Sequence, residues 1–441
     1  MAGNLPCGSA AAAANDFEFV SSRTPVVKLL IYSHAFAPQI GGVETFSMYL
    51  AGALACVNPK ENSDRFVVTV VTKTEGIAAE ISSEVPFEVV RRPSSWSLWR
   101  LIGQMDKVLL AGPAILPLIF ALIRRKPVVV THHGYQSICP NGMLFHFPTQ
   151  RSCRGHFASR QYLECVKCNA AQDKLAGSAR LLMLTFVRRL CSRLANSNVA
   201  VSEHVRGRIN LPKTLVIRNG VPEPSQSPEV VRDRRNQPRP ICFAYVGRLV
   251  TEKGVPVLIE AAGILKKRGS VFRIFVIGDG PDRAALQAQA CSLGLGPEVE
   301  FLGFLMGAQL DEAMTEVSAL VMPSICEDAA PFSVLEQMIQ GRLIIGSKLG
   351  GLAEEIGDSG LTFAAGDQIA LADEMGRVIE QPELIASLGK KAQERALQVY
   401  TLQRMIYEYS ILLTAGSVTR RLLPGAPAPR HVTDAGDASE G

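Results

Sequence analysis

The chain has 441 residues, 47% of them hydrophobic, which is enough to form two hydrophobic cores and excludes a single small domain. Its formal net charge of +5 comes from Lys and Arg residues scattered along the chain. The charge therefore does not indicate nucleic acid as a partner, and it leaves an anionic ligand or a membrane surface open.

The two ends of the chain have the composition of disordered segments. Residues 1–24 lack the basic start and the continuous apolar run of a signal peptide, and we predict a disordered leader. Residues 423–441 are predicted to be a disordered tail. Without a secretion signal we expect a cytoplasmic protein, whose ten cysteines are reduced thiols or metal ligands rather than a disulfide framework.

Short β-branched runs alternate with helix-length stretches over residues 25–221. The expected strands lie in VVKLLIYSH, RFVVTVVTK, KPVVVTHHG, NVAVSE and TLVIRNG. This alternation is typical of βαβ units around a parallel sheet, so we predict an N-terminal α/β domain. The apolar run Val108–Ile123 is shorter than the ~20 residues that span a membrane, and we predict that it forms one buried helix.

The segment Ser178–Ser197 predicts an amphipathic helix with Arg180, Arg188, Arg189 and Arg193 among Leu, Phe and Val. Such a helix can lie on an anionic membrane. It can also pack on the core with a basic face in water, which is the interpretation that we favour.

A polar, proline-bearing segment over residues 222–240 is predicted to be a linker, after which the alternation resumes over 241–400. A last helix is expected over residues 401–422. We therefore predict an α/β protein with two doubly wound domains. Open α/β sheets bind ligands at the carboxyl ends of their strands, so the site should lie where the two domains face each other.

The loop in GRLVTEKGVP follows the first expected strand of the second domain and carries two cations, Arg248 and Lys253. Gly254 leads into a helix with Pro256 in its first turn. Backbone N–H groups and the dipole at such a helix start suit a diphosphate, although a turn with surface charges is the simpler interpretation. The spacing is not GxxxxGK[ST], and Arg283 replaces the third glycine of a GxGxxG pattern in GDGPDR.

Two carboxylates flank a proline in PSICEDAAPFSVLEQMIQG, with Asp328 in an expected loop and Glu336 in a helix that should begin near Ser333. Ser333 and Glu336 match an S-x-x-E capping box, which is the structural interpretation of Glu336. The following Gly350 and Gly351 would allow a close approach of the backbone.

The order of GRLVTEKG, VIGDGP, FLGFL, PSICEDAAPFSVLEQMIQG and GGLAEEIGDSGLTF resembles the nucleotide-binding half of retaining GT-B glycosyltransferases, in particular glycosyltransferase family four. PQIGGVETFSMYLAGAL, VVVTHHG and VIRNGV extend the resemblance over roughly residues 25–400. It implies the GT-B fold, with two Rossmann-like domains facing a central cleft. It also implies transfer of a hexosyl or related sugar from a nucleotide-diphosphate sugar to a glycan, lipid-linked or other hydroxyl acceptor. Cell-surface polysaccharide or glycolipid synthesis, with peripheral contact at the inner face of the membrane, is the expected setting.

The resemblance also assigns roles on the nucleotide side of the site. Arg248 and Lys253, with Gly254, would bind the diphosphate, and Glu336 would accept hydrogen bonds from the ribose. Asp328 holds the first acid of the E-x7-E pattern, which contacts hydroxyls of the donor sugar. The family usually has Glu there, and in this sequence Glu327 stands one residue early.

On the N-terminal side, Gly41 and Gly42 would let the backbone approach the diphosphate, with Glu44 in the first helical turn. His133 matches a family histidine beside the reacting sugar, and His132 is its neighbour. The departing phosphate carries negative charge that cations, N–H groups or a metal must stabilise. No D-x-D follows an apolar strand, so we expect catalysis without a metal or other cofactor. The alternatives are a nucleotide-sugar epimerase of the same fold and a non-catalytic protein that binds sugar nucleotides.

Four cysteines lie in an expected insertion over residues 138–170 with the spacing C-x13-C-x11-C-x2-C: Cys139, Cys153, Cys165 and Cys168. Four thiolates would complete the tetrahedral shell of a structural zinc ion. Disulfides and four unlinked buried thiols are the alternatives. Similar insertions occur in a subset of the resembled family, and because this one begins soon after His133 we predict that it forms a wall of the acceptor side.

Overall fold

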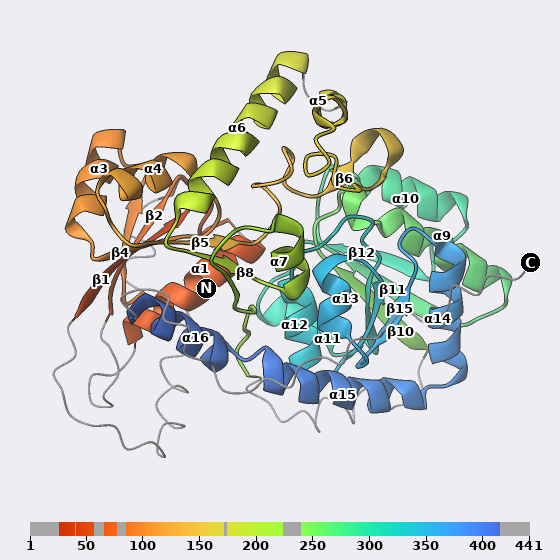
Figure 1. Ribbon diagram of the computed structural model, residues 1–441. Helices are drawn as coiled ribbons and strands as arrows, with labels where there is room; N and C mark the ends of the chain where they lie inside the picture. Colours follow the sequence, from red (N-terminus) through yellow and green to blue (C-terminus); the bar gives the residue numbers. More distant parts are fainter. Residues whose placement is uncertain are drawn as a thin grey trace, which may run out of the picture.

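The computed structural model describes residues 26–39, 41–56, 66–76, 85–171, 174–223 and 240–414 (Figure 1). The predicted leader and tail, nearly all of the predicted linker, and the end of the predicted last helix lie outside these residues. The linker and its boundaries therefore stay a prediction.

The N-terminal sheet has seven strands in the order β3-β2-β1-β4-β5-β8-β9, and every neighbouring pair is parallel. Its β-branched runs form strands because both faces of the sheet are covered by helices. In β1, Leu29 and Ile31 pack with Phe46 of α1 on one face, while Leu30 packs with Leu118 of α4 on the other. The strands are β1 (Val27–Ser33), β2 (Phe66–Thr72), β3 (Glu88–Arg91), β4 (Lys107–Leu110), β5 (Val128–His132), β8 (Ser197–Ala200) and β9 (Thr214–Val216).

Helices connect these strands and cover both faces of the sheet. They are α1 (Gly42–Cys56), α3 (Ser95–Gln104), α4 (Ile115–Ile123), α5 (Tyr162–Ala170), α6 (Leu175–Leu194) and α7 (Glu203–Ile209). A small antiparallel pair, β6 (Phe145–His146) and β7 (Arg151–Ser152), lies in the cysteine-bearing insertion together with the short 3-10 helix η1 (Phe147–Thr149).

The C-terminal sheet has six strands in the order β12-β11-β10-β13-β14-β15, again with only parallel pairs. The strands are β10 (Ile241–Val246), β11 (Phe272–Ile277), β12 (Val299–Gly303), β13 (Ala319–Met322), β14 (Leu343–Ser347) and β15 (Leu361–Phe363). The helices around it are the 3-10 turn η2 (Thr251–Lys253), α9 (Val255–Lys267), α10 (Arg283–Ser292), α11 (Ala308–Met314), α12 (Phe332–Ile339), α13 (Gly350–Ile356), α14 (Gln368–Glu380) and α15 (Glu383–Val399). The predicted α/β fold with parallel sheets is confirmed.

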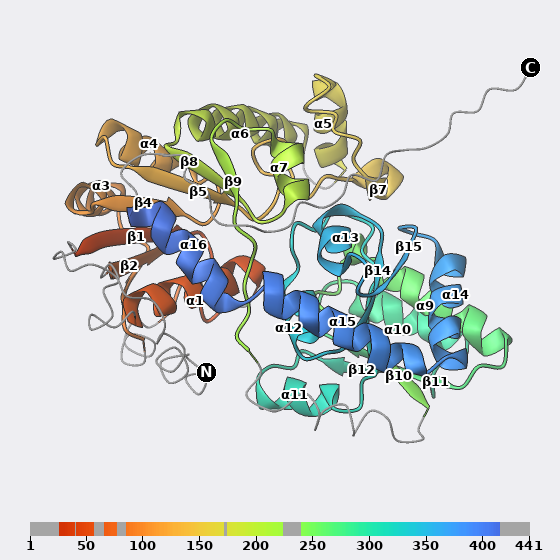
Figure 2. The ribbon, with the colours of Figure 1, turned by 60° about the horizontal axis from the view of Figure 1, so that its bottom comes forward.

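The last described helix, α16 (Leu402–Thr414), returns to the N-terminal sheet (Figure 2). It follows α15 after a short break and packs beside α1, where the hydroxyl of Tyr409 lies 3.1 Å from that of Thr131 in β5. At the break, the amide of Val221 donates to the carbonyl of Tyr400, and the amide of Leu402 donates to the carbonyl of Val221, each over 2.9 Å. The chain therefore closes back on its first domain.

The prediction of one buried helix over Val108–Ile123 is wrong. The run begins in strand β4, turns at Gly112, whose φ is +126°, and becomes helical only at Ile115. β4 pairs between β1 and β5, so its apolar residues fill the centre of the sheet. No helix in the described part of the chain is long and apolar enough to cross a membrane.

Candidate active site

The loop after β10 is held by a tyrosine hydroxyl and by a glycine turn. The hydroxyl of Tyr245 donates to the carbonyl of Arg248 over 2.7 Å, and Gly254 takes a φ of +69° before α9 begins. A Cβ at Gly254 would overlap the carbonyl oxygen of Pro323, so the turn requires glycine. The side chain of Arg248 is exposed and forms no ion pair with the described residues, which leaves a cation available at this turn.

Lys253 and Asp328 form an ion pair across the carboxyl ends of β10 and β13. Nζ of Lys253 donates to Oδ1 of Asp328 over 2.5 Å, and Oγ of Ser324 donates to Oδ2 over 2.5 Å. Burial alone would lower the pKa of Lys253, but the charge of Asp328 and this hydrogen bond raise it. Lys253 is therefore a fixed ammonium, and both oxygens of Asp328 are oriented.

Glu336 lies in the second turn of α12, and its carboxylate forms no hydrogen bond with the described residues. Burial, assisted by the charge of Asp311, raises the pKa of Glu336 to about 7. The predicted capping box is wrong, because Pro331 is the N-cap residue and Ser333 lies inside the helix without a capping bond. Capping therefore does not explain Glu336.

Glu327 contacts the N-terminal domain, and no motif in the sequence indicated this contact. Its carboxylate accepts hydrogen bonds from Oγ of Ser152 over 2.9 Å and from Nε2 of His204 over 2.7 Å. Nη2 of Arg208 donates to it over 3.1 Å. Asp328 thus faces Lys253, while Glu327 joins the same loop to the opposite domain.

A second carboxylate joins the domains at α13. Glu354 accepts hydrogen bonds from the amides of Glu203 and His204 at the start of α7, over 3.1 and 2.9 Å, and from Arg218 over 3.1 Å. Oγ of Ser202 donates to the carbonyl of Ala329 over 2.8 Å. These groups all follow strands β8, β9, β13 and β14, so the carboxyl ends of the two sheets face each other.

The glycine pair Gly350-Gly351 supports the loop of Asp328. The amide of Gly351 donates to the carbonyl of Asp328 over 2.6 Å, and a Cβ at Gly351 would overlap the carbonyl oxygen of Ala329. The close backbone approach expected at this pair is thus made to the acidic loop itself.

His133 follows β5 and stacks near α1, with its ring 4.3 Å from that of Phe46. Burial, with the neighbouring His132, lowers the pKa of His133 to about 3, so the ring is neutral, and its Nε2 has no partner among the described residues. His132 is fully buried, donates from Nε2 to Asn198 over 3.0 Å, and has a pKa lowered to about 4 by burial. His132 is structural, and His133 remains the candidate.

Gly41 and Gly42 lie at the start of α1, opposite the start of α12. A Cβ at Gly42 would lie 3.6 Å from Cδ2 of Phe332, whose ring centroid is 6.4 Å from that of Tyr49. This contact places α12 beside α1, and burial together with the charge of Glu336 raises the pKa of Tyr49 to about 12. The structure therefore brings the glycine turn, His133 and the acid-bearing helix to one junction.

The four cysteines of the insertion are buried and unlinked. Sγ of Cys139 donates to Asn141 over 2.9 Å, and Sγ of Cys168 donates to the carbonyl of Phe145 over 3.5 Å. Burial raises the pKa of Cys139 to about 11 and that of Cys165 to about 12, so these groups are thiols.

Among the described residues, no group of three or more His, Cys, Asp or Glu is arranged to hold a metal ion. Zinc binding by the four cysteines therefore stays a prediction. Cys139, Cys153 and Cys165 share a hydrophobic cluster, and Cys165 and Cys168 both lie on α5.

This arrangement of two facing parallel sheets is the GT-B fold of glycosyltransferases. Solved structures with the same fold include Anabaena HepE in complex with UDP-glucose, with a TM-score of 0.65 and 19% identity over 88% of this chain and 99% of that one. WaaG, a glycosyltransferase of lipopolysaccharide biosynthesis, gives 0.60 and 16% over 88% and 100%. The predicted GT-B fold is confirmed.

Residues 227–395 match the family model of the glycosyl transferases group 1. The chain is 34% identical to 2-deoxystreptamine glucosyltransferase of Streptomyces kanamyceticus over 32% of this chain and 36% of that protein. It is 22% identical to one subunit of the phosphatidylinositol N-acetylglucosaminyltransferase of Arabidopsis thaliana over 91% and 86%. The matches to the first relative and to two further Streptomyces transferases span 36–42% of their lengths. Residues 227–395 of this chain are thus similar to the glycosyl transferases group 1.

Proposed function

We propose that the protein is a retaining glycosyltransferase of family four that moves a sugar from a nucleotide-diphosphate sugar to a hydroxyl acceptor. The observation that carries this proposal is the Lys253–Asp328 ion pair at the junction of the two sheets, with Arg248 and Glu336 free of partners in the described part of the chain. The solved complexes of HepE with UDP and UDP-glucose support a nucleotide-sugar donor for this fold.

Cleavage of the donor leaves negative charge on the departing diphosphate. Arg248 and Lys253 supply two positive charges, and the start of α9 adds N–H groups behind Gly254. Gly41 and Gly42 offer the start of α1 from the opposite domain. We propose a metal-independent reaction because these groups provide the stabilisation that a metal ion would otherwise give.

The two acids of the E-x7-E spacing have separate roles in this proposal. Glu336 accepts hydrogen bonds from the ribose hydroxyls, since its carboxylate has no competing donor among the described residues. Asp328, oriented by Lys253 and Ser324, faces the hydroxyls of the donor sugar. A neutral His133 exchanges hydrogen bonds with the reacting sugar and adds no charge. The donor phosphate then takes the proton of the acceptor hydroxyl.

The acceptor is proposed to be a glycan or a lipid-linked molecule, in polysaccharide or glycolipid synthesis at the cytoplasmic face of a membrane. Matches to D-rhamnosyltransferase WbpZ of Pseudomonas aeruginosa, 29% identical over 43% of this chain, and to WaaG support this setting. The insertion over residues 138–170 reaches the junction through Ser152, whose Oγ donates to Glu327 of the C-terminal domain.

The test is incubation with a panel of UDP-, GDP-, ADP- and dTDP-sugars, with nucleotide release measured with and without glycan and lipid extracts as acceptors. A transferase releases nucleotide from one donor class, faster with acceptor. An epimerase converts the donor sugar without needing an acceptor, and a binding protein shifts only the melting temperature. Absence of both binding and release with every donor would contradict the proposal.

A further inference from the structure

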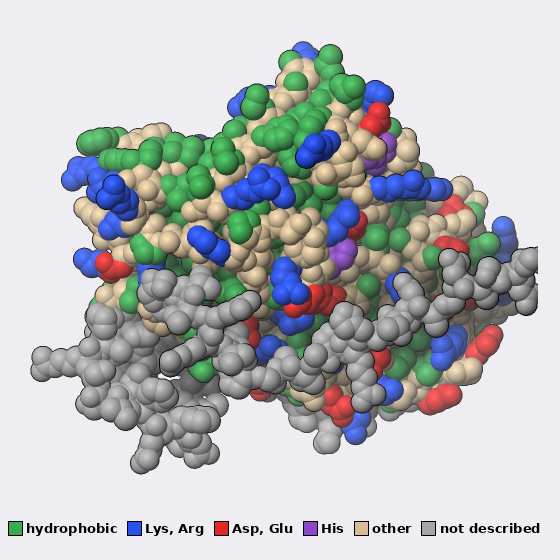
Figure 3. Space-filling model, in the orientation of Figure 1, with side chains coloured by type: hydrophobic (Ala, Val, Ile, Leu, Met, Phe, Trp, Pro, Cys, Tyr) green, Lys and Arg blue, Asp and Glu red, His purple; other side chains and the backbone are tan. Residues whose placement is uncertain are grey.

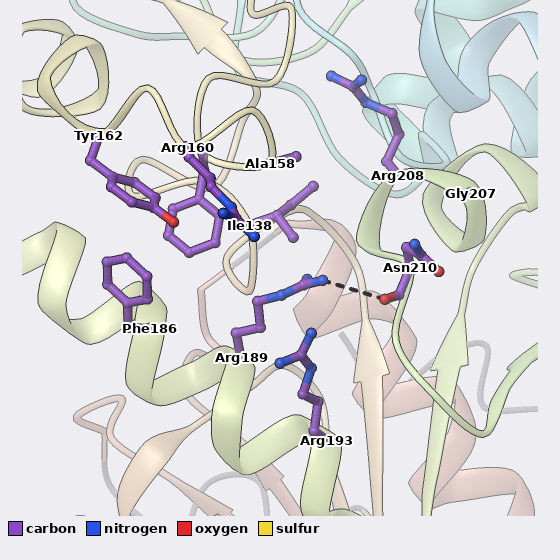
Figure 4. A pocket seen from close by; sticks show the side chains of 11 residues that line it. Ile138, Ala158, Arg160, Tyr162, Phe186, Arg189, Arg193, Gly207, Arg208 and Asn210 are labelled. Atoms are coloured by element: carbon purple, nitrogen blue, oxygen red, sulfur yellow. Dashed lines mark hydrogen bonds between the residues drawn. The ribbon is translucent and has the colours of Figure 1, made fainter.

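A hollow of about 580 Å³ opens on the N-terminal side of the junction, between the cysteine-bearing insertion, α6 and α7 (Figure 4). None of the groups proposed above to hold the donor lines it. Its walls combine aromatic rings with arginines, and no acidic residue is among the lining residues.

The aromatic wall comes from the insertion and from α6. The ring centroid of Phe157 lies 5.6 Å from that of Tyr162 and 4.9 Å from that of Phe186, and the last two rings are 5.0 Å apart. Phe186 remains 40% exposed, so this apolar surface is open to a ligand.

Four arginines form the remaining polar wall, and three of them lack an acidic partner. Arg208 pairs with Glu327, whereas Arg160, Arg189 and Arg193 form no ion pair with the described residues. Arg189 is held by the carbonyl of Ile209 over 2.8 Å, and Arg193 lies beside it on α6 (Figure 4). Burial and the charge of Arg193 lower the pKa of Arg189, which indicates that like charges converge here. An anion would relieve this repulsion.

An apolar stripe runs along α6 beside the hollow. Met183, Leu190 and Leu194 are 64%, 59% and 60% exposed, and Leu163 of α5 is 76% exposed. Figure 3 shows hydrophobic side chains gathered over this part of the surface with Lys and Arg among them. A ligand that carries an apolar chain next to its anionic group would cover both surfaces.

We propose that this hollow binds the phosphate group of an amphiphilic acceptor, whose apolar chain lies on Phe186 and the stripe of α6. This proposal rests on the proposed transferase function. Arg208 lines the hollow and also pairs with Glu327, the chain neighbour of Asp328, so the hollow is connected to the acidic loop through this ion pair.

The probe is octyl phosphate below its critical micelle concentration. Its binding to the protein is measured by calorimetry and compared with the binding of octyl glucoside and of inorganic phosphate at equal ionic strength. We expect octyl phosphate to bind on the order of tenfold more tightly than either, because only it has both the charge and the chain. Equal affinity for inorganic phosphate would overturn the amphiphile proposal and indicate a simple anion site.

The variant R160Q/R193Q tests the arginines without disturbing a described ion pair, and Phe186→Ala tests the aromatic wall. Arg180→Gln, exposed on the same helix but outside the hollow, is the matched control. We expect octyl phosphate binding to weaken on the order of tenfold in both test variants and to stay unchanged in the control. Unchanged binding in R160Q/R193Q would overturn the proposal. Nucleotide-sugar binding by the unaltered protein is measured in parallel, so failure of the transferase function is seen separately.

Discussion

Glu327 and Asp328 are neighbours in the chain whose carboxylates bind partners in opposite domains. Asp328 accepts from Lys253 of its own domain over 2.5 Å, and Glu327 accepts from His204 of the other domain over 2.7 Å. The loop is therefore held from both sides, and a movement between the domains would shift Asp328, the acid that we propose faces the donor sugar. We predict that closure of the junction and orientation of Asp328 are coupled.

Glu327→Ala tests the coupling between closure of the junction and orientation of Asp328. It leaves three buried or half-buried donors without an acceptor, which should lower the free energy of unfolding by about 3 kcal/mol and reduce transfer more than nucleotide affinity. Glu327→Gln, which keeps an acceptor, should recover part of both. Thermal unfolding and kcat are the measurements, with Glu203→Gln as a control because Glu203 pairs only within its own helix through its side chain. Unchanged stability and turnover in Glu327→Ala would contradict the coupling.

Lys253→Met and Arg248→Ala should each lower kcat by roughly 100-fold, about 3 kcal/mol, because each removes a positive charge from the departing diphosphate. The exposed Lys267→Met on α9 is the control. Because Lys253→Met also leaves Asp328 unpaired, its thermal stability must be measured, whereas the exposed Arg248 should be replaceable without loss of stability. Turnover near that of the unaltered protein in both variants would show that neither residue takes part in the reaction.

Glu336 gives a prediction for pH. The pKa of Glu336 is raised to about 7 in the folded protein, so ionisation of Glu336 lowers the free energy of unfolding. This loss of stability is absent below the pKa that Glu336 has in the unfolded chain, and it grows as the pH rises through about 7. Between pH 5 and 8 the free energy of unfolding of Glu336→Gln should therefore increase relative to that of the unaltered protein. The upper bound is about 3 kcal/mol, and partial exposure of the side chain to water makes the gain smaller.

The same carboxylate should control nucleotide binding. Ribose hydroxyls donate to the ionised form, so affinity should rise with pH through about 7 in the unaltered protein. Glu336→Gln should bind the nucleotide more weakly, and its affinity should lack this rise with pH. The comparison therefore distinguishes titration of Glu336 from titration of the nucleotide phosphate. Calorimetry at pH 5.5, 7 and 8.5 measures both proteins. Parallel pH profiles would show that Glu336 does not touch the ribose.

Asp328→Ala should reduce transfer at least tenfold more than it reduces affinity for the bare nucleotide, since the carboxylate faces the sugar. Affinity for the bare nucleotide should stay the same or rise, because Lys253 is freed from its partner. Competitive binding of UDP or the preferred nucleotide, beside kcat with the intact donor, distinguishes the two. Equal losses in both would place Asp328 on the nucleotide side.

The cysteines of the insertion should behave as buried thiols. A thiol reagent at pH 8 should label Cys139, Cys153, Cys165 and Cys168 slowly in the native state and fully after unfolding, because all four are buried. Exposed Cys291 provides the internal control for rapid labelling. Stoichiometric zinc in protein purified without chelator would contradict this prediction and show that the four cysteines bind a metal.

The strands were predictable because β-branched runs separated by turn residues leave few alternatives, as in VVKLLIYSH for β1. The strand-turn-helix unit over Val108–Ile123 was missed because both pieces are apolar and periodicity does not separate a buried strand from a buried helix. The spacing of Asp328 and Glu336 could be recognised in the sequence because both residues lie in one short segment. The partners of Glu327 lie 119 to 175 residues away along the chain, and only the folded arrangement of the two sheets brings them together.

The contact between Val221 and Tyr400 lies where the chain passes between the two domains. The chain passes between the domains both near Val221 and near Tyr400, and two backbone hydrogen bonds of 2.9 Å tie these passages to each other. Because both passages meet at one point, we expect the domains to move relative to each other by rotation about it. A small rotation there becomes a larger displacement at Glu327, so opening of the junction would break the bonds that Glu327 and Glu354 form with the N-terminal domain. Small-angle scattering of Glu327→Ala, with a larger radius of gyration than the unaltered protein, would reveal this rotation.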